Sequence, residues 1–90
     1  MTYSVKLSPP AAKAYQKLDP AFKSRVHAAL ETLHNHPLDG PQITRLKGRL
    51  RAYFRYRVGD SRILYTVSPS DRLVHVDYLQ HRKDVYRRFG

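Results

Sequence analysis

Three arginines around one short turn are the residues of this chain best suited to chemistry. Arg55 and Arg57 precede the dipeptide Gly59-Asp60, and Arg62 follows it. A two-residue loop that begins with glycine is typical of a tight II′ hairpin, whose register would place Arg57 opposite Arg62. Residues two apart on a strand share a face, so we expect the three guanidinium groups, the arginine cluster, on one surface. Like charges opposite each other destabilise a sheet, and we therefore expect a polyanion to bind there.

Further groups that suit nucleic acid flank this hairpin. Guanidinium groups bind phosphates and stack on bases, and an exposed aromatic ring offers a stacking surface. The residues that we predict to bind RNA beside the arginine cluster are Arg45, Lys47, Arg49, Arg51 and Tyr53. A basic surface that is merely solvated is the alternative for all of these residues.

A second group of candidate residues follows the last predicted strand. His81 carries an imidazole, which titrates near neutral pH and so suits proton transfer. Arg82 suits the binding of a phosphate, and Tyr86 could orient one through its hydroxyl or stack on a base. The alternative is that Tyr86 packs the tail onto the fold while His81 is simply exposed.

Composition and charge favour one small domain with a polyanionic partner. The chain has 90 residues, which we expect to form a single domain, 1–90. The net charge is +10, and residues 45–90 hold twelve basic and four acidic side chains; this asymmetry favours nucleic acid or an acidic protein segment as the partner. There is no cysteine, no run of about 18 apolar residues that could span a membrane, and no apolar N-terminal stretch typical of a secretory signal. We therefore expect a cytoplasmic protein without membrane association.

Two helices with almost no connection are predicted in the first half. Residues 3–7 alternate apolar and polar side chains, which predicts a short first strand. Ser8 and Asp19 each precede a proline, and both suit the N-cap position of a helix. The apolar face of the second helix recurs with the α-helical period and comprises Phe22, Val26, Ala29, Leu30 and Leu33. Pro37 predicts the end of that helix.

Three strands in quick succession are predicted in the second half, over residues 52–58, 62–67 and 73–79. Short turns join them, so we expect an antiparallel meander. Residues 43–50 hold too few apolar side chains to belong to the core and are predicted to be a basic loop. The side chains expected to face the helices are Phe54, Tyr56, Val58, Ile63, Tyr65, Val67, Val74, Val76 and Tyr78.

These elements predict an α+β fold. An N-terminal strand, a helical hairpin and a three-stranded antiparallel meander would form one sheet with the helices on one face, followed by a short C-terminal helical tail over residues 81–89. The other face, here called the open face, would carry the arginine cluster. Asp77 has the parity of this face, and we expect it to pair with an arginine there.

Two motifs in the second half resemble the RelE/ParE superfamily of type II toxins. They are residues 55–65, RYRVGDSRILY, and residues 81–86, HRKDVY. The order of strand, helical hairpin and a Leu46-Lys47-Gly48 approach extends the resemblance over nearly the whole chain. The resemblance implies a RelE-like fold and a small toxin that is neutralised by an antitoxin encoded beside it. RelE-like members cleave mRNA in the ribosomal A site, whereas ParE-like members poison DNA gyrase.

The resemblance also implies roles for individual residues. Arg55 and Arg57 stand at strand positions that hold lysines in the best-known RelE, one of which is considered the general base. Arg62 matches the arginine that stabilises charge on the scissile phosphate. Arg82 matches the arginine proposed as general acid, and Tyr86 matches the tyrosine that orients the substrate.

The implied reaction is attack of a 2′-hydroxyl on the adjacent phosphate with departure of the 5′-oxygen, without a metal or another cofactor. The nucleophile is tethered to its target, so positioning and charge stabilisation do most of the work. An arginine does not deprotonate in a protein, so arginines at the lysine positions leave the base unassigned. We expect His81 to transfer the proton as acid or base. The alternatives are a site that acts almost wholly by electrostatics and one that no longer cleaves RNA.

Three functions therefore stay open. The first is a ribosome-dependent endoribonuclease toxin that inhibits translation, the second is a ParE-like gyrase inhibitor, and the third is a toxin homologue that only binds its antitoxin. The implied partners are a RelB-like antitoxin with an acidic, helical segment, the ribosome and mRNA. Contact with operator DNA would be indirect, through the antitoxin.

Overall fold

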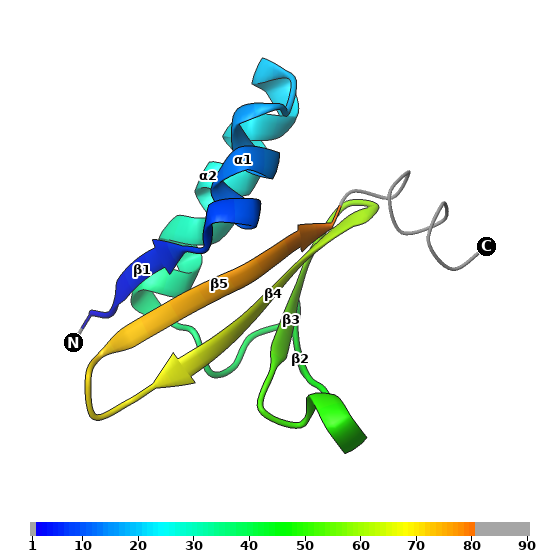
Figure 1. Ribbon diagram of the computed structural model, residues 1–90. Helices are drawn as coiled ribbons and strands as arrows, with labels where there is room; N and C mark the ends of the chain where they lie inside the picture. The colour runs from blue at the N-terminus through cyan, green and yellow to red at the C-terminus, as the bar shows by residue number, and fades with distance from the viewer. Residues whose placement is uncertain (1, 81–90) are drawn as a thin grey trace.

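The computed structural model describes residues 2–80 (Figure 1). Its helices are α1 (Pro9–Gln16) and α2 (Pro20–Asn35), and a 3₁₀ turn, η1, covers Gly48–Leu50. The strands are β1 (Ser4–Leu7), β2 (Ile43–Arg45), β3 (Phe54–Val58), β4 (Ser61–Ser68) and β5 (Leu73–Gln80). Neither helix in this part of the chain is long and apolar enough to cross a lipid bilayer. The predicted helical tail, with His81, Arg82 and Tyr86, lies outside the described residues.

Both helices begin at the side chains that the sequence predicts as caps. The Ser8 hydroxyl accepts a hydrogen bond from the Ala11 backbone N–H at 3.2 Å, and the Asp19 carboxylate accepts one from the Phe22 N–H at 2.9 Å. Each cap satisfies a backbone donor that has no partner inside its own helix. The predicted apolar face of α2 is confirmed, because Val26, Ala29 and Leu33 are buried and Phe22 and Leu30 pack against them.

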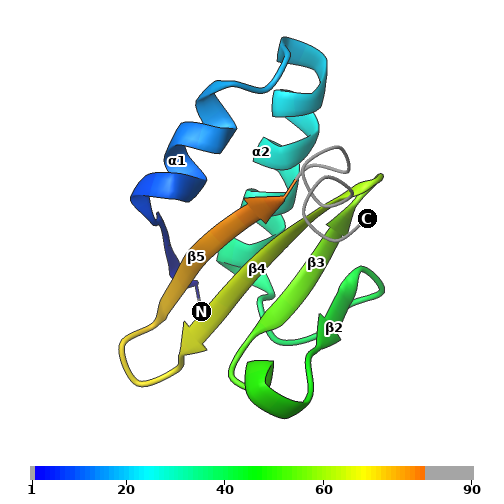
Figure 2. The same ribbon diagram turned by 45° about the vertical axis from the view of Figure 1, so that its right-hand side comes forward.

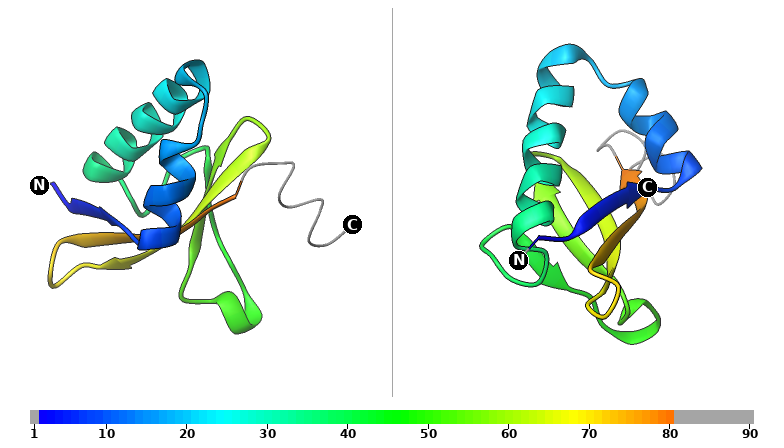
Figure 3. Two further views of the ribbon diagram at one scale, coloured as in Figure 1. Left: turned by 45° about the horizontal axis from the view of Figure 1, so that its top comes forward. Right: turned by 90° about the vertical axis from the view of Figure 1, so that its left-hand side faces the viewer.

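The strands form one five-stranded sheet in the order β1-β5-β4-β3-β2 (Figure 2). β1 pairs with β5 in parallel, and all other neighbours are antiparallel. Both helices lie on one side of the sheet (Figure 3), as the predicted α+β fold requires. The prediction of a plain loop over residues 43–50 is wrong at its start, because β2 pairs with β3 and Ile43 packs against the core.

The β3–β4 hairpin has the predicted register. Arg57 lies opposite Arg62, and Arg55 lies opposite Leu64. Gly59 has a φ of +57°. Arg72 is the one non-glycine residue with positive φ in residues 2–80, so Asp60 has negative φ. Positive φ followed by negative φ is the pattern of a II′ turn.

The β5 strand contains a bulge that the sequence analysis did not predict. Tyr65 lies opposite Val76 whereas Leu64 lies opposite Tyr78, so Asp77 is an extra residue in β5. The alternation of faces reverses beyond this point. Val76 is buried as predicted, but the prediction that Tyr78 faces the helices is wrong: its exposed fraction is 46 %, and Leu79 packs against the core instead.

Tyr65 is the largest fully buried side chain among the described residues. Its ring stacks on that of Phe54 with a centroid distance of 5.5 Å. Its hydroxyl donates a hydrogen bond to the Pro37 carbonyl oxygen at 2.7 Å, which fastens the segment after α2 to the sheet. Burial raises the pKa of the Tyr65 phenol above its ordinary value.

Candidate nucleic-acid interface

The side chains of the open face are arranged in three rows that run across the strands. The arginine row contains Arg57, Arg62 and Gln80; the middle row contains Arg55, Leu64 and Tyr78; the histidine row contains Thr66 and His75. Successive rows are two residues apart on β4, which corresponds to about 7 Å. The arrangement follows from the hairpin register on one side of β4 and from the bulge on the other.

The arginine row places two guanidinium groups on directly opposed residues. Arg57 is exposed and Arg62 is half-buried. The Arg62 Nε donates a hydrogen bond to the Gln80 side-chain oxygen at 2.9 Å. Gln80 is neutral, so this contact orients the Arg62 guanidinium without offsetting its charge. The predicted convergence of Arg55, Arg57 and Arg62 on one face is confirmed by the register.

A polar hollow of about 220 Å³ lies beside the arginine cluster, at the edge of the sheet formed by β2. It is lined by Pro41, Gln42, Thr44, Arg55 and Arg57. Two guanidinium groups with a hydroxyl suit an anion such as a phosphate, because charge-assisted hydrogen bonds to oxyanions are strong. The predicted phosphate-binding surface therefore includes a hollow that two of its three arginines line.

A larger cavity of about 350 Å³ lies between α2 and the end of β3, and Arg25 and Gly59 are among its lining residues. An ideal Cβ at Gly59 would lie 3.0 Å from a guanidinium nitrogen of Arg25. The Arg25 side chain of α2 therefore packs against the hairpin turn that presents Arg57 and Arg62. The helical periodicity of α2 gives no sign of this contact, so Arg25 was not among the predicted site residues.

The Asp77 carboxylate joins two side chains of the open face. One oxygen contacts the His75 Nδ1, and the other accepts a hydrogen bond from the Tyr53 hydroxyl. Asp77 pairs with none of the arginines in residues 2–80, so the expectation that it pairs with an arginine of the open face is wrong. The bulge causes the difference, because it gives Asp77 no directly opposed residue on β4 and turns it toward its own strand neighbour and Tyr53. The hydrogen bond to Asp77, together with desolvation, raises the pKa of Tyr53 to about 12.

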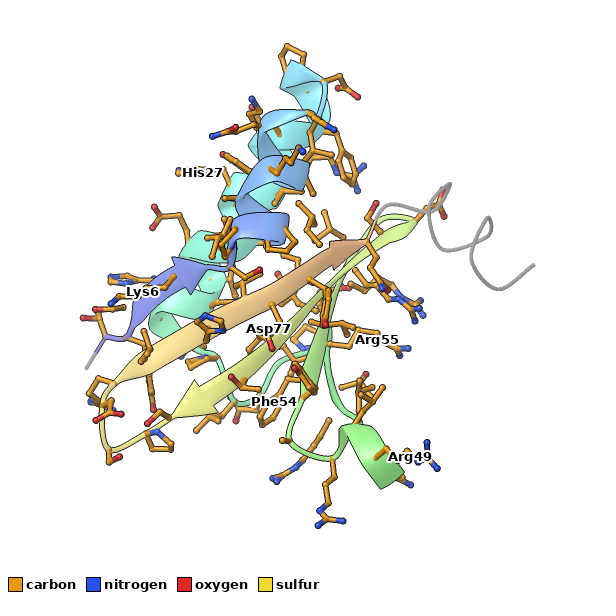
Figure 4. The ribbon with its side chains drawn as sticks, viewed as in Figure 1. Lys6, His27, Arg49, Phe54, Arg55 and Asp77 are labelled. Carbon is orange, nitrogen blue, oxygen red and sulfur yellow. The ribbon has the colours of Figure 1, made fainter. Side chains whose placement is uncertain are left out.

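The predicted RNA-binding residues around η1 do not all lie with the arginine cluster. Lys47, Arg49 and Arg51 are exposed, and Figure 4 shows Arg49 on η1 well apart from Arg55. The Arg45 guanidinium lies 5.5 Å from the ring centroid of Phe54, a residue on the helix-covered face. Tyr53 adjoins the histidine row through its hydrogen bond to Asp77, and the roles of all five residues in RNA binding stay predictions.

The family model described as "ParE toxin of type II toxin-antitoxin system, parDE" matches residues 5–86. The chain belongs to this toxin family. The match covers both motifs on which the resemblance to the RelE/ParE superfamily was based, and it confirms that resemblance.

Relatives of this toxin carry RelE names. A candidate toxin named RelE1 from Methanocaldococcus jannaschii is 28 % identical over 97 % of this chain and 98 % of its own. The toxin also resembles the archaeal RelE–RelB complex of Pyrococcus horikoshii, with a TM-score of 0.78 and 29 % identity over 91 % of this chain and 97 % of that one. A third relative is the toxin–antitoxin complex RelBE2 of Mycobacterium tuberculosis, with a TM-score of 0.75 and 26 % identity over 91 % of this chain and all of that one.

Three residues of the open face in this toxin were missed by sequence reasoning, namely His75, Tyr78 and Gln80. Their placement depends on the bulge in β5. The available signal was the spacing of the apolar residues Val74, Val76 and Leu79, which changes from two to three at Asp77. Such a change is what an inserted bulge residue produces in an alternating strand.

Proposed function

We propose that this toxin is a ribosome-dependent mRNA endoribonuclease that inhibits translation. The observation that carries the proposal is the pairing of Arg57 with Arg62 on the open face, with Arg55 in the next row. A sheet that places like charges opposite each other loses stability, and a bound phosphate backbone offsets that repulsion. RelE names among relatives at 26–29 % identity support the choice of mRNA as the polyanion.

The proposed reaction is attack of the 2′-hydroxyl on the adjacent phosphate, with departure of the 5′-oxygen. Arg62 stabilises the extra negative charge on the phosphate in the transition state, and Gln80 holds the guanidinium in position. Arg55 and Arg57 bind the RNA backbone at the polar hollow. No metal or other cofactor takes part in this scheme.

Proton transfer in the proposed reaction falls to residues outside the described part of the chain. The resemblance to RelE proposes Arg82 as general acid and Tyr86 as the group that orients the substrate. Neither Arg55 nor Arg57 can serve as a base, since arginine stays protonated in proteins. We therefore assign proton transfer to His81, whose imidazole can gain and lose a proton near neutral pH.

The test is primer extension on a translated message with purified ribosomes and the toxin. Arg62→Ala should lower the cleavage rate by at least about a hundredfold, because it removes a charge aimed at the transition state. Lys13→Ala is the matched control, since it removes one positive charge from the exposed side of α1. Cleavage by Arg62→Ala at the rate of the Lys13→Ala control would refute the assignment.

An antitoxin is the second proposed partner. The two structural relatives named above are RelE–RelB and RelBE2 toxin–antitoxin complexes, and the net charge of +10 favours an acidic segment. We propose a RelB-like antitoxin with a helical segment that folds onto the toxin and loses conformational entropy as it binds. Operator DNA would be contacted through the antitoxin only, and the toxin would act in the cytoplasm, where ribosomes translate.

Inhibition of DNA gyrase is the alternative function. The observation that favours it is the matching family model, whose description is that of ParE. A supercoiling assay with purified gyrase separates the two activities, because only the alternative predicts inhibition in the absence of ribosomes. A toxin homologue that only binds its antitoxin would cause no growth arrest when expressed alone and would be inactive in both assays.

A further inference from the structure

Two side chains of the open face have no role in the proposed cleavage chemistry. Tyr78 lies in the middle row with 46 % of its surface exposed. His75 lies in the histidine row, and 45 % of its side chain is exposed. Both belong to β5, and neither is among the residues of the hydrophobic core or packed against it.

The contact with Asp77 fixes which atom His75 presents to a ligand. An ionised carboxylate only accepts hydrogen bonds, so the His75 Nδ1 that contacts Asp77 carries the proton. With Nδ1 as the donor, the neutral form of this imidazole has Nε2 as its acceptor. Tyr53 donates to the second oxygen of Asp77 and holds the carboxylate in place, so Tyr53 and Asp77 are positioning residues.

The middle row combines the groups that bind a nucleobase. Arg55 and Tyr78 lie on the two strands that flank β4, about 10 Å apart, and Leu64 lies between them in the register. Leu64 is 9 % exposed although it belongs to the open face, so it forms an apolar floor between a cation and an aromatic ring. Stacking of a base on an aromatic side chain is sequence-tolerant and strong.

We propose that Tyr78 and His75 form a nucleobase subsite on the open face, in which a base stacks on Tyr78 and its amino group donates a hydrogen bond to the His75 Nε2. The inference rests on the proposed function and names the part of the RNA that this face reads. The middle row lies about 7 Å from the arginine row, so the bound base belongs to a nucleotide next to the cleaved phosphate. Adenine, cytosine and guanine each carry an exocyclic amino group that Nε2 can accept from, whereas uracil does not.

The charges of this surface favour RNA over an acidic peptide as its occupant. The Asp77 carboxylate stands between Tyr53 and His75, where a second carboxylate would be repelled. A base edge is uncharged, and its phosphate lies outside this position, toward Arg55 and Arg62. The arginine row therefore suits the phosphates of a nucleotide chain, and Tyr78 and His75 suit one of its bases.

The experiment measures ribosome-dependent cleavage rates over a set of A-site codons that differ at one base. Tyr78→Ala should lower the rate by about tenfold through lost stacking, and Tyr78→Phe should restore most of it. His75→Phe should retain cleavage but remove the preference for bases with an amino group over uracil at one codon position. Thermal unfolding of each variant establishes that it is folded.

Two matched controls accompany these variants. Leu38→Ala removes a side chain that is 47 % exposed, close to the fraction of Tyr78, from the connection after α2. His27→Phe removes another histidine that faces a carboxylate, Glu31, at 3.6 Å. Both controls should cleave all codons like the wild type.

Different experimental outcomes would overturn the nucleobase subsite and the proposed endoribonuclease activity. Wild-type rates and codon preference in Tyr78→Ala and His75→Phe, with Arg62→Ala inactive, would overturn the subsite and leave the endoribonuclease standing. Wild-type cleavage together with weakened binding of the antitoxin would assign this surface to the protein partner and also overturn the subsite. A wild-type toxin that does not cleave translated mRNA would overturn both.

Discussion

Asp77 contacts two neighbours on the open face and shifts the pKa of one of them, Tyr53. Its carboxylate accepts the Tyr53 hydroxyl hydrogen and contacts the His75 Nδ1. The neutral phenol is stabilised by this acceptor, and the pKa of Tyr53 is raised to about 12. A raised pKa in the folded state means that the contribution to stability is complete below the ordinary tyrosine pKa of about 10 and is lost as the pH rises through about 12.

We predict that Asp77→Asn lowers the pKa of Tyr53 toward its ordinary value, because the amide lacks the negative charge that opposes phenolate formation. The measurement is an alkaline titration of tyrosine absorbance, with Tyr53→Phe used to subtract the other tyrosines. In urea unfolding, the wild type should lose stability relative to Tyr53→Phe between about pH 10 and about pH 12. A Tyr53 pKa that is the same in Asp77→Asn and the wild type would contradict the assignment.

The Ser61 hydroxyl gives a second prediction for a single residue. Among residues 2–80 it is the buried side-chain polar atom that has no hydrogen-bond partner, and Ser61 is 3 % exposed opposite Val58. An unsatisfied buried hydroxyl retains its desolvation penalty, so Ser61→Ala should raise the free energy of unfolding by about 1 kcal/mol. Urea denaturation measures the change. Ser24→Ala, which removes an exposed hydroxyl on α2, should give no gain.

The β3–β4 hairpin shows how one element depends on another. Gly59 needs a φ of +57°, a conformation that side chains with a Cβ disfavour, and a Cβ there would also lie 3.0 Å from Arg25. Gly48 has a similar φ of +67° but no heavy atom within 4 Å of its ideal Cβ. The two glycines therefore separate backbone strain from the contact with α2.

We predict that Gly48→Ala destabilises the fold by about 1 kcal/mol through strain alone, and that Gly59→Ala destabilises it by more. The excess at Gly59 comes from the displaced Arg25 guanidinium. It should disappear when Gly59→Ala is made in an Arg25→Ala background, and chemical denaturation of the four variants completes this cycle. Equal losses for both glycine substitutions would show that the Arg25 guanidinium moves aside without a measurable cost.

The elements differ in how far the sequence predicts them, for physical reasons. The register of the hairpin was predictable because a two-residue turn fixes the pairing, and the N-caps of α1 and α2 were predictable because Ser8 and Asp19 act locally. β2 was missed because a three-residue edge strand is held by backbone pairing and contributes only Ile43 to the core. An edge strand that short leaves no alternating pattern to detect.

The residues of the candidate site also differ in how far the sequence predicts their positions. The convergence of Arg55, Arg57 and Arg62 follows from local register, whereas the positions of Tyr78 and Gln80 depend on the bulge at Asp77. A single extra residue reverses the face of the sheet on which each later residue of the strand lies. The only sign of this bulge in the sequence is the changed spacing between Val76 and Leu79. The contact between Arg25 and Gly59 joins residues that are 34 positions apart, which no local pattern reports.

The whole molecule carries a net charge of +10, and the repulsion among these charges lowers the free energy of unfolding. A high net charge destabilises a compact state by self-repulsion, and salt screens this effect over a Debye length of about 10 Å at 0.1 M. The arginine row concentrates the repulsion, because Arg57 and Arg62 are directly opposed. The toxin should therefore be more stable with added salt, most of all when an anion such as sulfate can occupy the polar hollow.

We predict that Arg57→Gln makes the free toxin more stable while it impairs RNA cleavage. Removing one of two opposed charges should raise the free energy of unfolding by about 0.2–1 kcal/mol at low ionic strength, and the gain should fade near 1 M salt, where the Debye length is about 3 Å. Lys13→Gln is the control, because it removes the same unit of net charge from α1 without relieving an opposed pair. Urea denaturation of both variants at two salt concentrations measures the difference. If the two variants gained equal stability, net charge alone would account for the effect. The opposed pair would then impose no penalty for a bound phosphate to offset, and the repulsion between Arg57 and Arg62 would give no reason to expect a polyanion on this face.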